Sequence, residues 1–463
     1  MNRLMNAPGR LARRLLPRQR RAAAERLPAF VVPADAIAAL PDPAAFRRTL
    51  LQLIAGAERR IVIVALYLQD DDGGREVLAA LYAARARHPE LRITLYVDWH
   101  RARRGLIGQA HSEGNAGMYR EFARRLGEGV EIRGVPVQGR ELLGVLHLKG
   151  WVIDDTVLYT GASLNDVYLA RHGRYRLDRY HLLRHRGLAD ALAGFVERQF
   201  AGNAAVPRLD TPTEPPTRAL LPAIRELRQS LQSASYVVPE QAAPADDEVA
   251  VTPLLGLGRT GNALNDMVLT LLQEARERVV LFTPYFNLPR PVRAAVGHAL
   301  RRGCRIDIMV GDKTANDFYI PPGQPFTTIG LLPYLYENNL RRFARAHARQ
   351  LASGQLNLWL WRDGDNSYHL KGLRVDQHAA LLTGHNLNPR AWSLDLENGL
   401  LLRDPARQLQ AMHEAEWEEL RRHAVRLADY RALESPRHYP PEVRRLLRRL
   451  SRVRLDRLVN WLL

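Results

Sequence analysis

HLKGWVIDD (His147–Asp155) returns later in the chain as HLKGLRVDQ (His369–Gln377). Both copies place His, Lys and Asp in the frame H-x-K-x-x-x-x-D. A single H-x-K is most often a surface histidine that has a lysine nearby. Two copies in one polypeptide instead indicate a duplicated unit whose histidines meet in one site.

Similar sequence patterns surround the two motifs. Strand-like apolar runs flank a helical stretch in each half, at Arg59–Leu68 with Leu91–Trp99 and at Glu277–Phe286 with Cys304–Asp312. A further strand candidate precedes each motif and a glycine turn follows it, at Val130–Val137 and Thr160–Asp166 in the first half and at Gln355–Trp361 and Thr383–Pro389 in the second. Strand–helix–strand is the pattern of a parallel crossover unit. The sequence therefore predicts an α/β fold of two similar halves, related by a pseudo-twofold, with an active site at their interface.

Proline-rich, acidic stretches separate the two halves, and basic stretches flank them. The composition of the separating stretches is typical of linkers. We expect five parts: a basic N-terminal arm (1–33), a first half (34–205), a linker with a connecting helix (206–250), a second half (251–435) and a basic amphipathic helix (436–463).

Composition limits the possible partners. The 463-residue chain has a formal net charge of +18 at pH 7, which points to nucleic acid or an anionic lipid surface. Its single cysteine, Cys304, excludes an intramolecular disulfide and is typical of a reducing cytosol. No apolar run reaches the roughly 18 residues that span a bilayer. The arginine-rich N-terminus has no acid before Glu25, as in transit peptides, and we interpret it as a basic surface arm.

Lysine is rare, and its placement is informative. Of 67 basic residues only three are lysine: Lys149, Lys313 and Lys371. Two of them occupy the same position of the duplicated motif. An ammonium is a compact point charge, whereas a guanidinium is a wide planar fork, and a tight phosphate pocket can require the former. The sequence therefore predicts that Lys149 and Lys371 bind phosphate.

Two histidines that meet across an interface suit phosphoryl transfer through a covalent intermediate. One imidazole attacks phosphorus and the other protonates the departing oxygen. A carboxylate on the second ring nitrogen of each fixes its tautomer. Cationic and amide donors stabilise the charge on the phosphate oxygens, and the candidates are Lys149, Lys371, Asn165 and Asn388. This chemistry requires no metal, and we expect no cofactor.

The pair HLKGWVID…TGASLN and HLKGLRVD…TGHNLN resembles the two signature motifs of the phospholipase D superfamily. Other stretches resemble its bacterial phosphatidylserine synthase branch: VDWHRARRG, VGDKTANDFYIPPGQPF, LLPYLYENNLRRF, NPRAWSLDLENGLL and the basic C-terminus. The resemblance covers nearly the whole chain. It implies the conversion of CDP-diacylglycerol and L-serine to phosphatidylserine and CMP, by a cytoplasmic enzyme bound peripherally to the inner face of the cell membrane.

The resemblance also implies residue roles. His147 and His369 match the catalytic histidines, with His147 as the nucleophile by the usual superfamily assignment. The phosphate-binding positions are those of Lys149, Lys371, Asn165 and Asn388, and the motif aspartates that hold each motif together are Asp154 and Asp376. The carboxylates that orient the histidines follow downstream of them, and we choose Asp178 and Glu397, with Asp395 near the latter.

Three more residues are candidates for substrate binding. Ala162 and His385 depart from the small or serine residue common at these positions in the superfamily, so Ser163 is the candidate hydroxyl in the first copy. Asn386 is the candidate substrate-binding residue in the second copy. Lys313 follows the second strand of its half, at the end where open α/β sheets bind ligands. We expect its ammonium to contact the diphosphate or the serine carboxylate.

The segment from Val443 to Leu463 has apolar residues at helical spacing and arginines over much of the rest. A basic amphipathic helix that ends in tryptophan suits the surface of an anionic bilayer. The predicted membrane contacts are Arg444, Arg445, Arg448, Arg449, Arg452 and Trp461. Packing on the catalytic core and binding of nucleic acid are the alternative interpretations of this helix.

Another phosphodiesterase of the same superfamily is the alternative function, either a nuclease or a transferase similar to cardiolipin synthase. The apolar stripe with Trp461 and the scarcity of aromatic residues argue against nucleic acid as the partner. Cardiolipin synthases commonly carry membrane-spanning segments, and the sequence shows none.

Overall fold

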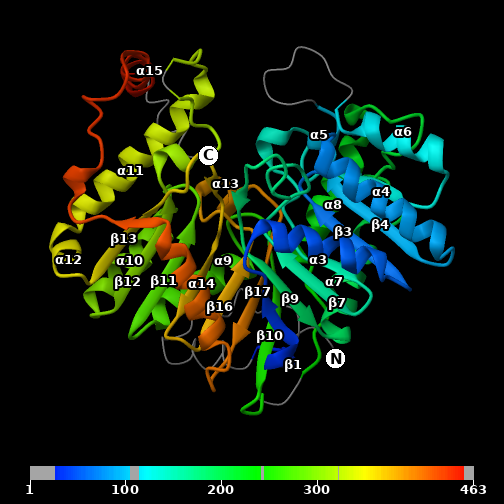
Figure 1. Ribbon diagram of the computed structural model, residues 1–463, viewed down its shortest axis with the longest axis horizontal. Coiled ribbons are helices and arrows are strands. Elements are labelled where there is room, and N and C mark those ends of the chain that lie inside the picture. The colour runs from blue at the N-terminus through cyan, green and yellow to red at the C-terminus, as the bar shows by residue number, and fades with distance from the viewer. Residues whose placement is uncertain (1–26, 105–113, 241–243, 322, 453–463) are drawn as a thin grey trace.

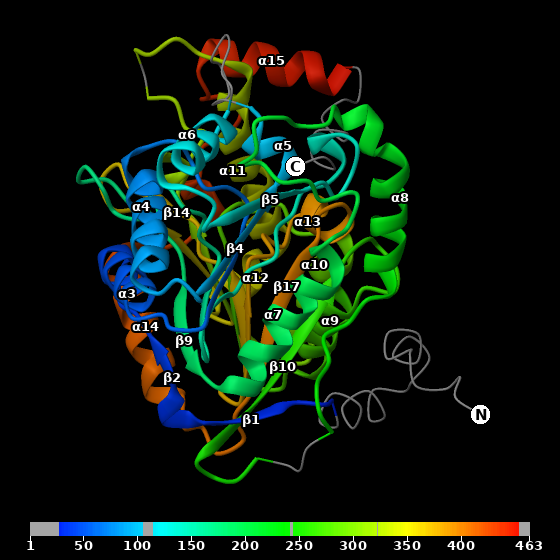
Figure 2. The same ribbon diagram turned by 90° about the vertical axis from the view of Figure 1, so that its right-hand side faces the viewer.

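Two mixed β-sheets and the helices packed against them make up the computed structural model, which describes residues 27–104, 114–240, 244–321 and 323–452 (Figures 1 and 2). The seven-stranded sheet has the order β2 (Ile37–Ala39), β9 (Tyr180–Arg184), β7 (Thr156–Thr160), β6 (Trp151–Ile153), β3 (Arg60–Ala65), β4 (Arg92–Asp98) and β5 (Glu131–Val135). The nine-stranded sheet has the order β1 (Phe30–Pro33), β10 (Glu248–Gly256), β17 (Glu397–Arg403), β16 (Ala379–Thr383), β15 (Gly372–Val375), β11 (Arg278–Thr283), β12 (Arg305–Gly311), β13 (Leu356–Trp361) and β18 (Ala424–Arg426).

Each sheet contains six strands that have the same order and the same relative directions as six strands of the other sheet. In the first half β3 pairs parallel with β4, β4 parallel with β5, and β3 antiparallel with β6. In the second half β11, β12, β13 and β15 pair in the same way. Antiparallel β7 and β9 complete the first set, and β16 and β17 the second. The prediction of two similar α/β halves is therefore confirmed.

Helices connect the parallel strands. The helix that connects the first two parallel strands is α4 (Asp72–Arg87) in the first half and α10 (Arg290–Arg301) in the second. The other helices of the first half and the linker are α3 (Pro43–Ala55), α5 (Trp99–Ala102), α6 (Ala116–Leu126), α7 (Arg186–Phe200) and α8 (Thr217–Ser233). Those of the second half are α9 (Ala263–Glu274), α11 (Leu332–Ala346), α12 (Ala348–Ala352), α13 (Pro389–Ser393), α14 (Gln410–Arg422) and α15 (Pro441–Arg452). No helix of the described residues has the length and apolar character that crossing a membrane requires.

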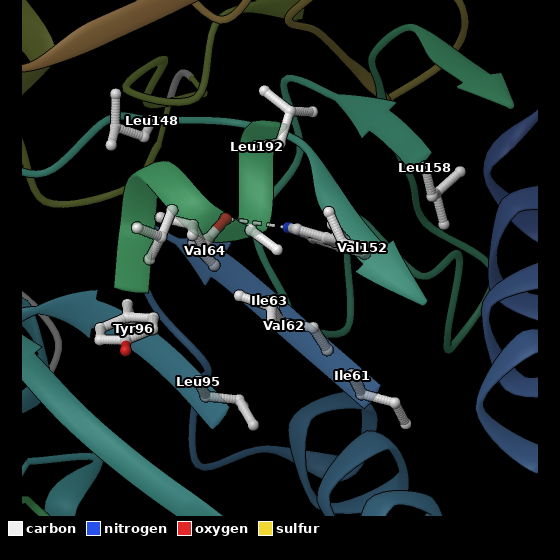
Figure 3. Packing of buried hydrophobic residues seen from close by; sticks show 14 of the residues in the cluster. Ile61, Val62, Ile63, Val64, Leu95, Tyr96, Leu148, Val152, Leu158 and Leu192 are labelled. Carbon is white, nitrogen blue, oxygen red and sulfur yellow. Dashed lines mark hydrogen bonds between the residues drawn. The ribbon is translucent and has the colours of Figure 1, made fainter. Parts of the chain in front are cut away.

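The first-half core forms around β3, which is buried from Ile61 to Ala65 because helices and loops cover both faces of its sheet (Figure 3). Trp151 of β6 fills the adjacent space and donates from Nε1 to the carbonyl oxygen of Val64 at 2.9 Å. The same apolar cluster continues into the second sheet through Leu400 and Leu402 of β17. The two halves therefore share part of one core.

Four short strands join the two halves. The strand β1, which the sequence assigned to the N-terminal arm, is instead the edge strand of the second sheet and pairs with β10. A few residues later β2 joins the first sheet, so this segment bridges both. Between the halves, β8 (Arg176–Leu177) pairs parallel with β14 (Ser367–Tyr368). Because β14 ends at Tyr368, this last pairing lies directly before the second motif, which begins at His369.

Candidate active site

The two motif histidines occupy equivalent positions at the interface of the halves. His147 donates its backbone N–H to the carbonyl of Leu396 at 2.9 Å, and His369 donates to the carbonyl of Leu177 at 2.8 Å. Each of these carbonyls directly precedes a candidate acid in the opposite half. Backbone pairing thus places each histidine beside a carboxylate that comes from the other copy of the repeat.

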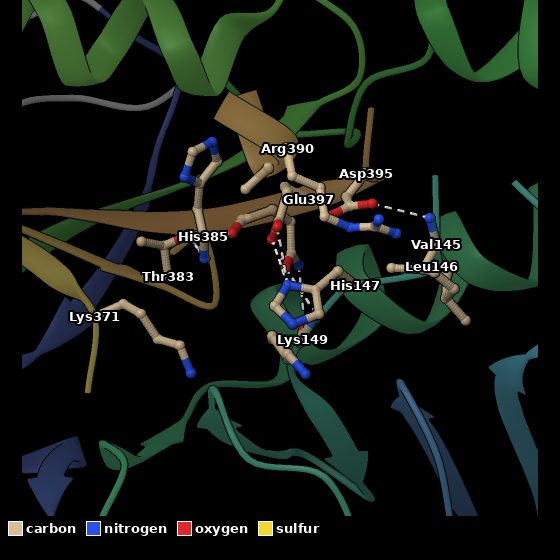
Figure 4. Close-up of polar contacts among 12 residues, drawn as sticks. Val145, Leu146, His147, Lys149, Lys371, Thr383, His385, Arg390, Asp395 and Glu397 are labelled. Carbon is tan, nitrogen blue, oxygen red and sulfur yellow. Dashed lines mark hydrogen bonds and ion pairs between the residues drawn. The ribbon is translucent and has the colours of Figure 1, made fainter. Parts of the chain in front are cut away.

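His147 faces Glu397 across this interface (Figure 4). Its Nδ1 lies 2.9 Å from both carboxylate oxygens of Glu397, and both side chains are buried. Asp395, the neighbouring acid, accepts instead from the backbone N–H of Val145 at 3.0 Å and pairs with Arg390. Of the two acids, Glu397 is therefore the one that can orient the His147 ring.

His369 has a different set of neighbours at Nδ1. The Tyr168 hydroxyl lies 2.9 Å away, Asp178 Oδ2 lies at 3.4 Å, and the Lys371 ammonium is in contact. Lys371 Nζ also donates to Asp178 Oδ2 at 2.8 Å. Tyr168 was not predicted from the sequence, although its place three residues after the motif Asn165 is the signal that could have indicated it.

Burial lowers the pKa values of the two lysines. Burial lowers the pKa of Lys149 to about 8, and the nearby Lys371 adds to the effect. Burial likewise lowers the pKa of Lys371, against the attraction of Asp178. Two ammonium groups in one buried site form a strongly attractive place for a phosphate.

The surroundings of the two acids shift their pKa values in opposite directions. Burial alone would raise the pKa of Asp178, but Lys371 and His369 outweigh it and hold the pKa at about 2. Burial raises the pKa of Glu397 well above its ordinary value, and Asp395 adds to the rise. Asp178 is therefore ionised and paired with Lys371, whereas Glu397 retains a proton more readily.

Burial also lowers the pKa values of both histidines. The pKa of His147 falls well below its ordinary value through burial and the two lysines, and that of His369 falls to about 4 through burial and Lys371. Both rings are therefore neutral at pH 7. A neutral imidazole is the form that can attack phosphorus.

The glycine turns that follow the motifs leave room for the charged groups. A Cβ on Gly161 would lie 2.5 and 2.8 Å from the carboxylate oxygens of Asp178. A Cβ on Gly384 would lie 2.7 Å from Cγ and 2.9 Å from Cε of Lys149. These two positions require glycine because the side chain of a candidate catalytic residue packs directly against the backbone there.

Each asparagine of these turns accepts from the backbone N–H three residues further along the chain. Asn165 Oδ1 accepts from the N–H of Tyr168 at 3.2 Å, and its Nδ2 donates to Gln69 at 3.2 Å. Asn388 Oδ1 accepts from the N–H of Ala391 at 2.9 Å and caps α13. Both asparagines are buried.

The remaining turn residues do not share one environment. Ser163 is buried. Asn386 uses its backbone carbonyl to accept from the Thr283 hydroxyl at 2.8 Å. The His385 ring points away from His147 in Figure 4, and its Nδ1 accepts from the N–H of Leu387 at 2.9 Å. His385 thus stabilises a turn in which Leu387 has a positive φ of 52°.

The motif aspartates bond to the backbone on which each central strand begins. Asp154 accepts from the N–H groups of Glu58, Arg59 and Arg60 at 2.9 to 3.1 Å, just before and at the start of β3. Asp376 accepts from Arg276, Glu277 and Arg278 at 2.8 to 2.9 Å, at the corresponding place before β11. The duplicated motif therefore carries a duplicated anchor as well as a duplicated histidine.

The structure does not bring Lys313 together with the histidine pair. Its ammonium lies 3.2 Å from Glu337 and 2.8 Å from Glu434, over the rings of Tyr334 and Tyr439 at 5.1 and 5.6 Å. The carboxylates of Glu337 on α11 and Glu434 in the C-terminal segment pair with this ammonium, which the sequence predicted to contact substrate. Within the described ranges, no group of three or more His, Cys, Asp or Glu side chains is placed to hold a metal.

The C-terminal helix α15 begins on the protein itself. Val443 is fully buried, and Leu446 and Leu447 pack partly against the same cluster, which includes Leu335 of α11. The arginines at 445, 448 and 449 are exposed and that at 444 is partly exposed. Core packing therefore accounts for the first turns of the predicted membrane stripe, and Trp461 lies outside the described residues.

Comparisons with known proteins agree with this geometry. Residues 268–420 match the family model described as cardiolipin synthase, PLD-like domain. The CDP-diacylglycerol–serine O-phosphatidyltransferase of Escherichia coli is 49% identical over 422 residues, which cover 91% of this chain and 93% of that protein. The enzyme of the same name from Haemophilus influenzae is 44% identical over 441 residues, which cover 94% of this chain and 97% of that protein.

A solved structure extends this similarity to the fold. The crystal structure of phosphatidylserine synthase from Haemophilus influenzae matches with a TM-score of 0.93 and 42% identity, covering 96% of this chain and 100% of that one. At this coverage the match includes both halves of the repeat. The chain thus belongs to the family of CDP-diacylglycerol–serine O-phosphatidyltransferases within the phospholipase D superfamily.

Proposed function

We propose that the protein transfers the phosphatidyl group of CDP-diacylglycerol to L-serine through a phosphatidyl-histidine intermediate. In the first step His147 Nε2 attacks the phosphorus that carries diacylglycerol, and the bond from phosphorus to the CMP oxygen breaks. His369, which becomes protonated to the imidazolium when the diphosphate is bound, gives its Nε2 proton to that oxygen and is left neutral. In the second step His369 takes the proton of the serine hydroxyl, the serine oxygen attacks phosphorus, and the phosphorus–nitrogen bond breaks.

The observation that carries this proposal is the difference between the partners of the two Nδ1 atoms. In its ionised form Glu397 only accepts, so it holds the His147 proton on Nδ1 and leaves a lone pair on Nε2, whereas a protonated Glu397 would donate to Nδ1; the proposed attack therefore requires the ionised form, against the raised pKa of this acid. Lys371 and Tyr168 can both donate to Nδ1 of the neutral His369 ring, which then carries its proton on Nε2, and Asp178 Oδ2 at 3.4 Å can accept from Nδ1 once the ring is protonated. The partners thus support His147 as the nucleophile and His369 as the acid.

The substrate itself strengthens this arrangement. The diphosphate of CDP-diacylglycerol brings negative charge close to His369 and the lysines, and a nearby opposite charge raises the pKa of a cationic group. His369 then protonates the departing oxygen more readily than its free-enzyme pKa of about 4 suggests. Lys149 and Lys371 stabilise the phosphate oxygens, with Asn165 and Asn388 holding the turns beside them.

The lipid substrate implies work at a membrane surface. We propose that exposed arginines of α15 and the residues that follow it attract the enzyme to anionic phospholipid at the inner face of the cell membrane. The net charge of +18 supports an anionic surface as partner. The lipid-transferring relatives favour this partner over nucleic acid.

The test is a direct assay of purified protein with CDP-diacylglycerol in detergent micelles and labelled serine. Chromatography of the lipid products should show labelled phosphatidylserine, with an equal amount of CMP released. Release of CMP that depends on added glycerol phosphate or phosphatidylglycerol, with no labelled lipid formed from serine, would contradict the proposed acceptor. Hydrolysis of a nucleic acid with no lipid product would contradict the proposed reaction altogether.

A further inference from the structure

A mostly buried ion pair lies beside His369 and takes no part in the proposed mechanism. Arg176 of β8 donates from Nε and Nη2 to Asp317 Oδ1, each at 2.8 Å. The side chains are only 18% and 10% exposed. Arg176 belongs to the first half, and Asp317 follows the short 3-10 helix η3 (Lys313–Ala315) of the second. The ion pair therefore spans the same interface between the halves at which the histidines lie.

Two tyrosines connect this pair to the reacting centre. Tyr285 donates to Asp317 Oδ2 at 2.8 Å, and its ring lies edge-on to His369 at 5.7 Å between centroids. Tyr168, which bonds to His369 Nδ1, lies under the Arg176 guanidinium at 4.8 Å from its centroid. A small molecule held by the ion pair would therefore sit within reach of the proposed general base.

The charges of the pair discriminate between possible ligands. Asp317 neutralises Arg176 and would repel a diphosphate, for which the two lysines already provide a place. A zwitterion is different, because it carries a carboxylate and an ammonium close together. Arg176 Nη1 makes a long contact of 3.5 Å with the Tyr67 hydroxyl and can donate to a carboxylate. Asp317 can accept from an ammonium.

We propose that Arg176 and Asp317 form the binding site for the amino-acid acceptor. The guanidinium binds the α-carboxylate of serine, the carboxylate of Asp317 binds its α-ammonium, and the rings of Tyr168 and Tyr285 flank the cation. This placement directs the serine hydroxyl toward His369, which removes its proton. The inference rests on the proposed function, since it names the acceptor site of the same reaction.

The test removes one charge from the protein and the matching charge from the acceptor. Ethanolamine lacks the α-carboxylate of serine, and 3-hydroxypropanoate lacks its ammonium. Arg176→Gln should raise the KM for serine by about 10- to 100-fold and abolish the preference for serine over ethanolamine. Asp317→Asn should abolish the preference for serine over 3-hydroxypropanoate. Neither variant should change the discrimination that the other one removes.

Exchange of labelled CMP into CDP-diacylglycerol, without serine, reports the first half-reaction separately. We expect Arg176→Lys, Arg176→Gln and Asp317→Asn to keep this exchange within a few-fold of the wild-type rate. Arg278→Gln is the matched control, because Arg278 forms an ion pair with buried Asp307 away from the histidines, and Asp307 keeps Arg305 as a partner. The control should alter neither exchange nor acceptor preference.

Two results would overturn the acceptor site. Exchange and serine transfer could fall together in Arg176→Gln and Asp317→Asn, which is the effect of a purely structural ion pair. Alternatively, both variants could retain the wild-type preference among the three acceptors. A wild-type enzyme that exchanges CMP but transfers nothing to serine would contradict the proposed function instead, so the two failures are distinguishable.

Discussion

Glu397 contacts His147 across 250 positions of sequence, with both carboxylate oxygens 2.9 Å from Nδ1. The second acid, Asp178, lies beside His369 in the reverse direction. Each half of the repeat therefore supplies the histidine of one pair and the carboxylate of the other. Neither half contains a complete catalytic pair by itself, so the active site exists only when the halves are docked.

The crossed pairing predicts which histidine responds to loss of each acid. Glu397→Gln should shift the imidazole ¹⁵N signals and the tautomer of His147 and leave those of His369 nearly unchanged, because only His147 bonds to this carboxylate. Asp178→Asn should change His369 instead. NMR of ¹⁵N-histidine-labelled protein measures both. Responses in the histidine of the same half would contradict the crossed arrangement.

A covalent adduct should form on His147. With CDP-diacylglycerol and no serine, the phosphatidyl group has no acceptor except water, and the adduct should accumulate most in a His369→Ala variant that lacks the base of the second step. Quenching at alkaline pH preserves the phosphorus–nitrogen bond for peptide mapping. An adduct on His369 in a His147→Ala variant, with none on His147 in the wild type, would reverse the roles. Either substitution should lower turnover by several orders of magnitude.

Much of this site could be predicted from the sequence, because a duplicated motif reports both its chemistry and its symmetry. The pairing could not, since downstream spacing identifies Asp178 and Glu397 but does not state which histidine each one meets. The position of Lys313 after a strand predicted contact with substrate, because open α/β sheets bind ligands at that end of their strands. In the structure its ammonium instead pairs with Glu337 and Glu434. Composition placed β1 in a basic arm, although its FVVP run pairs with β10.

The pH profile should fall on its alkaline side because of Lys149. Burial lowers the pKa of this ammonium to about 8, so it becomes neutral as the pH rises through that value and stabilises the phosphate less. Since kcat/KM reports the free enzyme, its alkaline limb should lie near pH 8. Lys149→Arg keeps the positive charge to much higher pH and should remove this limb, even if the rate is lower. The same limb in that variant would assign it to another group.

Alanine at either motif glycine should reduce activity without unfolding the protein. Gly384→Ala places a Cβ 2.7 Å from Lys149 Cγ, and Gly161→Ala places one 2.5 Å from an oxygen of Asp178. Displacement of a catalytic group by about 1 Å can cost about 100-fold in rate. Gly56→Ala is the control, since its Cβ would make only an ordinary 3.5 Å contact. Turnover in micelles and a thermal melt together check this; full activity in Gly384→Ala would show that Lys149 can move freely.

Membrane attachment should depend on the residues after the packed start of α15. Deletion of residues 450–463 keeps Val443, Leu446 and Leu447 on the core, so the thermal melt and turnover in mixed micelles should change little. Deletion from Val443 onward removes a fully buried side chain and should lower the melting temperature.

Binding to anionic vesicles should be lost in the shorter truncation and weakened by replacing the exposed Arg445, Arg448 and Arg449 with glutamine. Each arginine near such a surface contributes about 1 kcal/mol, and this attraction is screened at high salt. Flotation with anionic and neutral vesicles, at low and high salt, measures the effect. If the protein without residues 450–463 still floats with anionic vesicles, the attachment lies elsewhere in the basic surface, and the arginine-rich segment before Glu25 is the next region to test.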